Sequence, residues 1–153
     1  MKKIRTLLMV ALAAVTLVSC GKEEASEMIE GTYTGYTSAK FSYSPNPIVS
    51  DDETMTITAN EEKVDIACKF NRWGTMTVDK ATAKESGDNV AVSGSGIALI
   101  PSMTGDGSSS YDITFNGTVA KDKSTFDITI EMPALMGGTV ITYKNGKAPA
   151  SDK

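Results

Sequence analysis

The sequence predicts an all-β fold, a single antiparallel barrel of eight strands, with a β-sandwich as the alternative. From Gly31 onward, apolar side chains recur at every second position in successive short segments, the period of a strand with one buried face. Connections of about two to ten residues separate these segments, which is typical of antiparallel neighbours. No segment after the N-terminal apolar run has a sustained helical period, and closing the sheet would remove its exposed edges.

The first expected strand covers residues 31–43 and alternates most regularly. Its inward residues would be Tyr33, Gly35, Thr37, Ala39, Phe41 and Tyr43. A glycine on the inner face is typical of a bend or a close backbone approach, which barrels need. Residues 44–52 contain Pro45-Asn46-Pro47 and are expected to form a loop.

Seven further strands are expected. They cover residues 53–59, 63–70, 73–83, 90–100, 111–119, 124–132 and 139–143. The pairs Val90–Val92 and Ile97–Leu99 lie out of phase, so the two glycines between them predict a bulge or bend. Loops are expected at residues 84–89 and 101–110. Asn116-Gly117 could form a hairpin turn, but a continuous strand is preferred because residues 121–123 make a better-placed turn.

The N-terminal residues have the features of a secretory signal. Lys2, Lys3 and Arg5 precede an apolar run over residues 7–18. Twelve helical residues reach about 18 Å, short of the bilayer core of about 30 Å, so a cleaved signal is favoured over a spanning helix.

Leu17-Val18-Ser19-Cys20 resembles the bacterial lipobox. The resemblance implies cleavage between Ser19 and Cys20, acylation of Cys20, and attachment to a membrane through these acyl chains. The alternative is an ordinary signal peptide, residues 1–19, with an incidental cysteine. Lys22, Glu23 and Glu24 resemble the surface-export signal of Bacteroidetes lipoproteins, and the alternative is a charged tether without a sorting role. Residues 20–30 are expected to be a mobile acidic tether.

Composition excludes several function classes. Removal of residues 1–19 leaves 134 residues, enough for one domain, with 12 basic and 19 acidic side chains and a formal charge of −7. This charge disfavours nucleic acid and anionic membrane surfaces as partners. Histidine is absent from the sequence, which removes Ser-His-Asp and Cys-His nucleophiles. We therefore expect no enzyme activity, no metal and no cofactor.

Two features that could carry chemistry are interpreted as structural. Cys68 lies in phase with inward apolar residues and is interpreted as a core residue rather than a reactive thiol. The carboxylates of Asp51-Asp52-Glu53 and Glu61-Glu62 could bind Ca²⁺, but the spacing of an EF-hand is missing, and acidic hairpin ends are the preferred interpretation.

Residues 31–147, with 148–153 as a tail, resemble the calycin-like, or lipocalin-like, β-barrel domains of Bacteroidetes lipoproteins. The segments that carry the resemblance are Gly31-Thr32-Tyr33-Thr34-Gly35, Val92-Ser93-Gly94-Ser95-Gly96, Phe115-Asn116-Gly117-Thr118-Val119 and Met136-Gly137-Gly138. The resemblance implies a barrel fold and an outer-membrane, lipid-anchored protein that faces the cell surface. It implies no particular activity.

Large side chains are expected to lie in the barrel interior or to line a ligand pocket there. They are Tyr33, Phe41, Phe70, Trp73, Met76, Phe115 and Phe126. Eight-stranded barrels are either filled by side chains or hold one small ligand. The leading hypothesis is a binding protein for a small apolar molecule, a glycan or a host component. The alternative is an accessory lipoprotein that docks on another outer-membrane protein.

Overall fold

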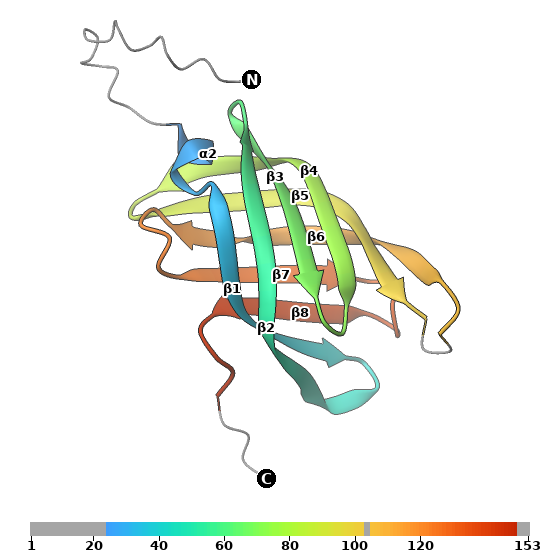
Figure 1. The fold of residues 1–153 in the computed structure, drawn as a ribbon. Helices are drawn as coiled ribbons and strands as arrows, with labels where there is room; N and C mark the ends of the chain where they lie inside the picture. The colour runs from blue at the N-terminus through green and yellow to red at the C-terminus, as the bar shows by residue number, and fades with distance from the viewer. Residues whose placement is uncertain (1–23, 103–104, 150–153) are drawn as a thin grey trace, which may run out of the picture.

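The computed structural model describes residues 24–102 and 105–149 of the chain. Eight antiparallel strands close into one barrel, in which each strand pairs with the next and β8 pairs with β1 (Figure 1). The prediction of an all-β, eight-stranded barrel is confirmed, and the sandwich alternative is excluded. The elements are α2 (Ala25–Met28), β1 (Gly31–Phe41), β2 (Ser44–Asn60), β3 (Lys63–Phe70), β4 (Gly74–Ser86), β5 (Asn89–Pro101), β6 (Ser108–Ala120), β7 (Phe126–Met132) and β8 (Thr139–Asn145).

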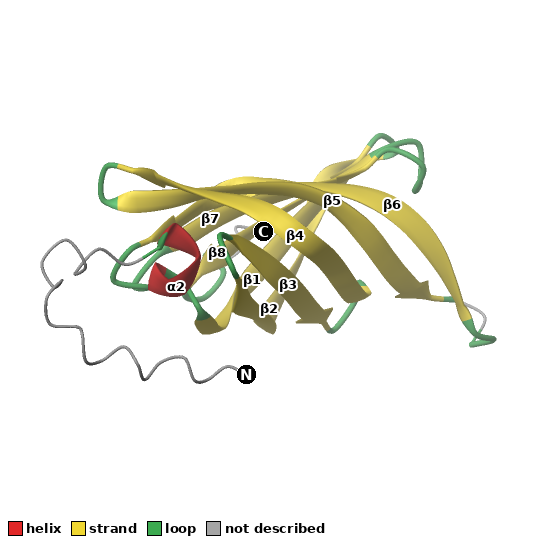
Figure 2. Cartoon of the chain, turned by 90° about the horizontal axis from the view of Figure 1, so that it is seen from above, coloured by secondary structure: helices red, strands yellow, loops and turns green. Residues whose placement is uncertain are grey.

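The barrel has two distinct ends. The α2 end holds α2 and the β2–β3, β4–β5 and β6–β7 turns, and the opposite end holds the other four connections. Figure 2 shows α2 packed beside the strands that curve around the interior. Among the described residues, no helix is both long and apolar enough to cross a bilayer.

Alternation places the core inside the barrel, as the period of two predicts. Met55 and Ile57 on β2 and Ile128 and Ile130 on β7 are at most 1% exposed. Burial of each such side chain contributes about 1.5–3 kcal/mol. Gly35 confirms the expected close approach, because a Cβ there would lie 1.9 Å from the backbone oxygen of Lys144.

Of the bulge or bend expected in β5, the bulge is wrong, because β5 pairs with β6 without a register shift. β5 keeps one phase throughout, so Val90, Val92 and Ala98 are buried while Ile97 and Leu99 are each 48% exposed. The irregularity lies on the neighbouring strand, where the β4–β5 register shifts between Val78 and Thr82. Ile97 and Leu99 lie on the outer face of β5, so their spacing does not mark an inward face.

The loop expected at residues 44–52 is also wrong, because these residues form the first half of β2. This half pairs with β1, whereas β3 pairs only from Thr54 onward. Pro45 and Pro47 are tolerated because a strand with one free side does not need every backbone N–H. Tyr43, expected inward, lies in the β1–β2 turn and is 79% exposed.

Two other loops are shorter than expected. β4 continues to Ser86 and β5 starts at Asn89, so only a two-residue turn connects them. β5 ends at Pro101 and β6 begins at Ser108. The backbone hydrogen bonds between strands continue through the polar residues at these strand ends, because such bonds do not require apolar side chains. The continuous β6 strand through Asn116-Gly117 is confirmed.

The prediction that residues 20–30 form a mobile tether is wrong for residues 25–30. Residues 25–28 form α2, and Ile29 is fully buried beneath it. The hydroxyl of Ser26 donates to the Glu61 carbonyl at 2.6 Å, and the Tyr33 hydroxyl donates to the Ile29 carbonyl at 2.5 Å. These contacts fasten the segment to the α2 end of the barrel.

Replacing Ile29 with alanine should destabilise the barrel by about 2–4 kcal/mol, because the change leaves a cavity under α2. Urea unfolding of the chain without residues 1–19 measures this loss. Thr32→Ala, at an exposed position of β1, is the control and should change the stability by less than about 0.5 kcal/mol. Equal unfolding midpoints for Ile29→Ala and the parent chain would show that α2 is not fastened through this residue.

Candidate functional site

Aromatic rings form a continuous column inside the barrel. Tyr143 lies at its centre, with ring centroids 5.0 Å from Phe70 and 4.7 Å from Phe126. Phe126 in turn packs edge-on against Tyr33 at 5.6 Å. Such pairs contribute about 0.5–1.5 kcal/mol beyond the area they bury. Four strands, β1, β3, β7 and β8, are thereby joined through side chains.

A buried carboxylate lies beside this column. Glu53 is fully buried, and its carboxylate accepts the Asn71 backbone N–H at 2.6 Å and the Thr37 hydroxyl at 3.3 Å. The Tyr143 hydroxyl donates to the Glu53 carbonyl oxygen at 2.9 Å. The interpretation of Glu53 as part of an acidic hairpin end is wrong, because it lies inside β2 and faces inward, two residues before Met55.

The side chains expected inside the barrel are placed as follows. Tyr33, Phe70, Trp73, Met76, Phe115 and Phe126 are each at most 5% exposed. Phe41 is half-buried at the opposite end, where its ring centroid lies 5.7 Å from that of Trp73. The Trp73 Nε1 donor is buried and makes no hydrogen bond. These side chains pack on one another, so the space they share is occupied by protein.

Burial raises the pKa values of three core groups, so each of them keeps its proton to a higher pH. It raises the pKa of the Cys68 thiol to about 12 and the pKa of the Tyr33 phenol to about 12. The pKa of Tyr143 is raised further, by burial first and then by its proximity to Cys68 and Glu53. A thiol with a raised pKa is a poor nucleophile, which agrees with a structural role for Cys68.

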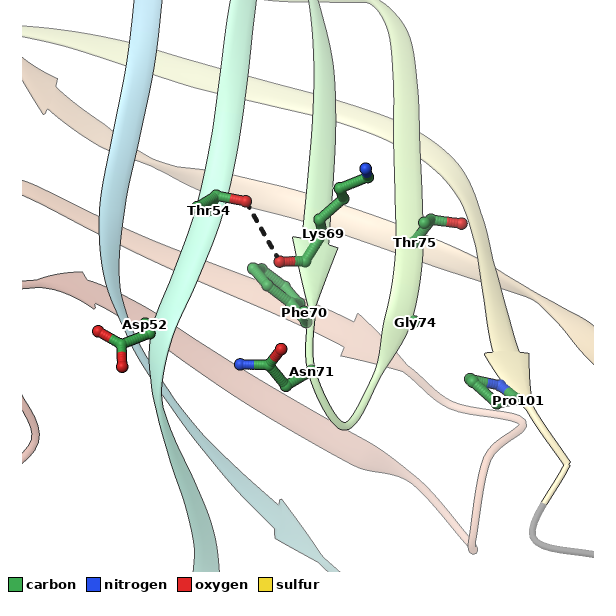
Figure 3. Close-up of a pocket in the computed structure, with 8 residues that line it drawn as sticks. All are labelled: Asp52, Thr54, Lys69, Phe70, Asn71, Gly74, Thr75 and Pro101. Atoms are coloured by element: carbon green, nitrogen blue, oxygen red, sulfur yellow. Dashed lines mark hydrogen bonds between the residues drawn. The ribbon is translucent and has the colours of Figure 1, made fainter. Parts of the chain in front are cut away.

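A hollow of about 480 Å³ lies on the outer wall of the barrel, and we call it the outer groove (Figure 3). It is lined by Asp52, Thr54, Lys69, Phe70, Asn71, Gly74, Thr75 and Pro101. These residues come from β2, the end of β3, the β3–β4 turn, the start of β4 and the end of β5. The groove therefore belongs to the opposite end of the barrel, away from α2.

The rim of the outer groove carries several kinds of polar group. Lys69 extends from the end of β3, and Asn71 points from the β3–β4 turn toward β2 (Figure 3). The Asn71 side-chain amide donates to the Asp51 carbonyl at 3.3 Å, which orients it. Together with the Asp52 carboxylate and the Thr54 hydroxyl, these side chains offer both donors and acceptors, an arrangement suited to a ligand rich in hydroxyl groups.

An exposed apolar strip continues from the groove along β5. Leu99 is paired with Thr75, a lining residue of the groove, and Ile97 is paired with Thr77. Half-exposed aliphatic side chains on an outer barrel wall give a partner an apolar contact next to the polar groove. The sequence argument missed this strip because it placed both residues in a bent strand.

The acidic residues show no metal-binding geometry. Within residues 24–102 and 105–149, no three Asp, Glu or Cys side chains lie together as metal ligands would. Asp51 and Asp52 instead hold the C-terminal segment, by accepting the Ala148 backbone N–H at 2.8 Å and the Lys147 ammonium at 3.3 Å.

The residues of the proposed anchor lie mostly outside the described part of the chain. Ser19, Cys20, Lys22 and Glu23 fall before its first residue. Glu24 is described and is the N-cap of α2, where its backbone N–H donates to the Glu27 carboxylate at 3.3 Å. Glu24 thus has a structural role apart from any role in sorting.

Comparison with known proteins gives two matches. The family model described as a calycin-like beta-barrel domain matches residues 29–146. A crystal structure of a candidate outer membrane protein from Bacteroides fragilis NCTC 9343 is similar, with a TM-score of 0.65 and 19% sequence identity. That match covers 81% of this chain but only 46% of the other, so the two proteins share a fold over part of the longer one. No curated protein matches.

Stability should fall at alkaline pH. Unfolded Cys and Tyr side chains lose their protons above about pH 9–10, whereas Cys68, Tyr33 and Tyr143 keep theirs in the folded chain. The free energy of unfolding therefore has its full value below that range and falls as the pH rises above it. The free energy of unfolding should fall by at most about 1.4 kcal/mol per pH unit for each proton that the folded chain retains. Urea midpoints measured between pH 8 and pH 11 test this.

Tyr33→Phe should reduce the alkaline slope, and Tyr43→Phe, at an exposed position, is the matched control and should leave it unchanged. A constant urea midpoint across this pH range would contradict the raised pKa values.

Proposed function

Because the chain belongs to the calycin-like β-barrel domain family, we propose that it is a lipid-anchored binding protein of the outer membrane, displayed at the cell surface, which binds its ligand in the outer groove. One observation carries this proposal. Aromatic and aliphatic side chains are buried and stacked inside the barrel, whereas the outer groove is a hollow lined by polar side chains that include both donors and acceptors. The proposal includes no catalytic step.

The location is supported by the N-terminal sequence. The basic start, the short apolar run and Cys20 fit a lipoprotein signal, and Lys22-Glu23-Glu24 fits surface export. The Bacteroides fragilis protein with a similar fold is described as an outer membrane protein candidate, which agrees with this placement. Two or three acyl chains on one cysteine would make the attachment stable.

The groove favours a glycan over a small apolar molecule. A sugar can accept hydrogen bonds from Lys69 and Asn71, while its ring C–H groups pack on Pro101. An apolar ligand would bury these polar groups without partners, at a cost of about 1–3 kcal/mol each.

A second candidate function is docking on another outer-membrane protein. The exposed strip of Ile97 and Leu99 favours it, because half-exposed aliphatic side chains beside a groove are common where proteins meet. Copurification from detergent-solubilised membranes distinguishes the two functions. A stoichiometric protein partner that is lost on Leu99→Lys would support docking.

Glycan binding should depend on the groove. Lys69→Ala and Asn71→Ala should each weaken binding to an oligosaccharide array about tenfold, the effect of one lost hydrogen bond to a ligand. Lys40→Ala, which removes an exposed lysine of β1 outside the groove, is the matched control and should bind as the parent does. Binding that survives both groove substitutions would rule the groove out as the site.

Membrane attachment should depend on Cys20. Cys20→Ala should move the protein from the membrane fraction to the soluble periplasmic fraction, because no acyl chain can be added. Fractionation and immunoblotting of cells measure this, and Cys68→Ala is the control because Cys68 is buried in the barrel. Unchanged membrane association of Cys20→Ala would contradict the lipid anchor.

A further inference from the structure

The connection between the proposed anchor and the folded barrel is very short. Cys20 and Glu24, the first described residue, are four residues apart in the sequence. Four residues span at most about 14 Å even when fully extended. The fold therefore begins within this distance of the acylated cysteine.

The start of the fold is itself fixed to the barrel. Ile29 is fully buried, and Ser26 and Tyr33 make the hydrogen bonds described above. The Glu30 carboxylate also accepts the Ala59 backbone N–H at 3.2 Å. Since α2 contacts both β2 and β4, it cannot act as an extension of the tether without losing these contacts.

We propose that the α2 end of the barrel lies against the lipid headgroup layer that holds the acyl chains, and that the outer groove points away from the membrane. This inference rests on the lipid anchor of the proposed function. The short tether imposes the contact, rather than electrostatic attraction, since the processed chain would carry a formal charge of −7.

The surface beside the chain entry suits a headgroup layer. A hollow of about 270 Å³ lies there, lined by Glu24, Glu62, Lys63, Thr82, Ala83 and Lys84. Its two lysines can contact lipid phosphates, and its glutamates can contact headgroup amines or bound cations. The described residues of this end are polar rather than apolar, so the contact is with headgroups and not with hydrocarbon.

The opposite end is held well away from the lipid. β3 alone spans Lys63–Phe70, which is about 23 Å at the rise of a strand. Figure 1 shows the β3–β4 turn at the far end of these strands from α2. Lys69, Asn71 and the rest of the outer groove are therefore presented to the surroundings of the cell.

Site-directed labelling of the native, acylated protein tests the orientation. Glu62→Cys and Arg72→Cys place a fluorophore on the β2–β3 and β3–β4 turns, and the buried Cys68 stays unlabelled. The protein is reconstituted in phosphatidylcholine vesicles that contain a lipid with a nitroxide on its headgroup. Fluorescence at position 62 should be quenched several-fold more than at position 72. Lys84→Cys and Asp106→Cys provide a second pair on the same two ends.

Insertion of a Gly-Ser linker of about 20 residues between Glu23 and Glu24 is the control, since its average span of about 25 Å frees the barrel from the surface. The difference between positions 62 and 72 should then disappear. Equal quenching at both positions in the native, vesicle-bound protein would overturn the orientation while leaving the anchor intact. Failure of the native protein to float with vesicles would instead overturn the anchor and the proposed function.

Discussion

The Tyr143 hydroxyl makes the contact on which the closure of the barrel most depends. It donates to the Glu53 carbonyl on β2 at 2.9 Å and lies 3.4 Å from the Tyr33 carbonyl on β1. The sheet closes only where β8 pairs with β1. Tyr143 on β8 bonds to carbonyl groups of β1 and β2, so it stabilises this closing pair from inside the barrel. The Glu53 carboxylate extends the same network to Asn71, and so positions the turn that forms part of the outer groove.

This network is the reason that the proposed ligand site is assigned to the outer groove and not to the interior. A barrel that stacks four aromatic rings across its interior gains stability and leaves that interior little room for a ligand. The polar groups of the outer groove come from β2, the end of β3 and the β3–β4 turn. The fold is thus a rigid support, and a ligand would meet residues held in place by the core behind them.

Much of this fold follows from local sequence, and the exceptions have identifiable causes. Alternation predicted the strands, and Gly35 correctly predicted a close backbone approach. The burial of Glu53 could be predicted from its alternation with Met55. Its hydrogen-bond partners Asn71 and Thr37 could not, because they lie in another turn and on another strand. α2 was missed because residues 24–30 are short and rich in glutamate, and only the finished barrel offers Ile29 a buried place. The strip of Ile97 and Leu99 was missed because hydrophobicity alone does not tell an inward face from an outward one.

The first half of β2 also affects how one copy of the chain can pair with another. Residues 44–50 pair with β1 on one side only, so they form an edge at which another copy could add a strand. Pro45 and Pro47 carry no N–H, and this removes donors from that edge. The two prolines thereby disfavour the addition of a strand from a second copy of the chain at this edge.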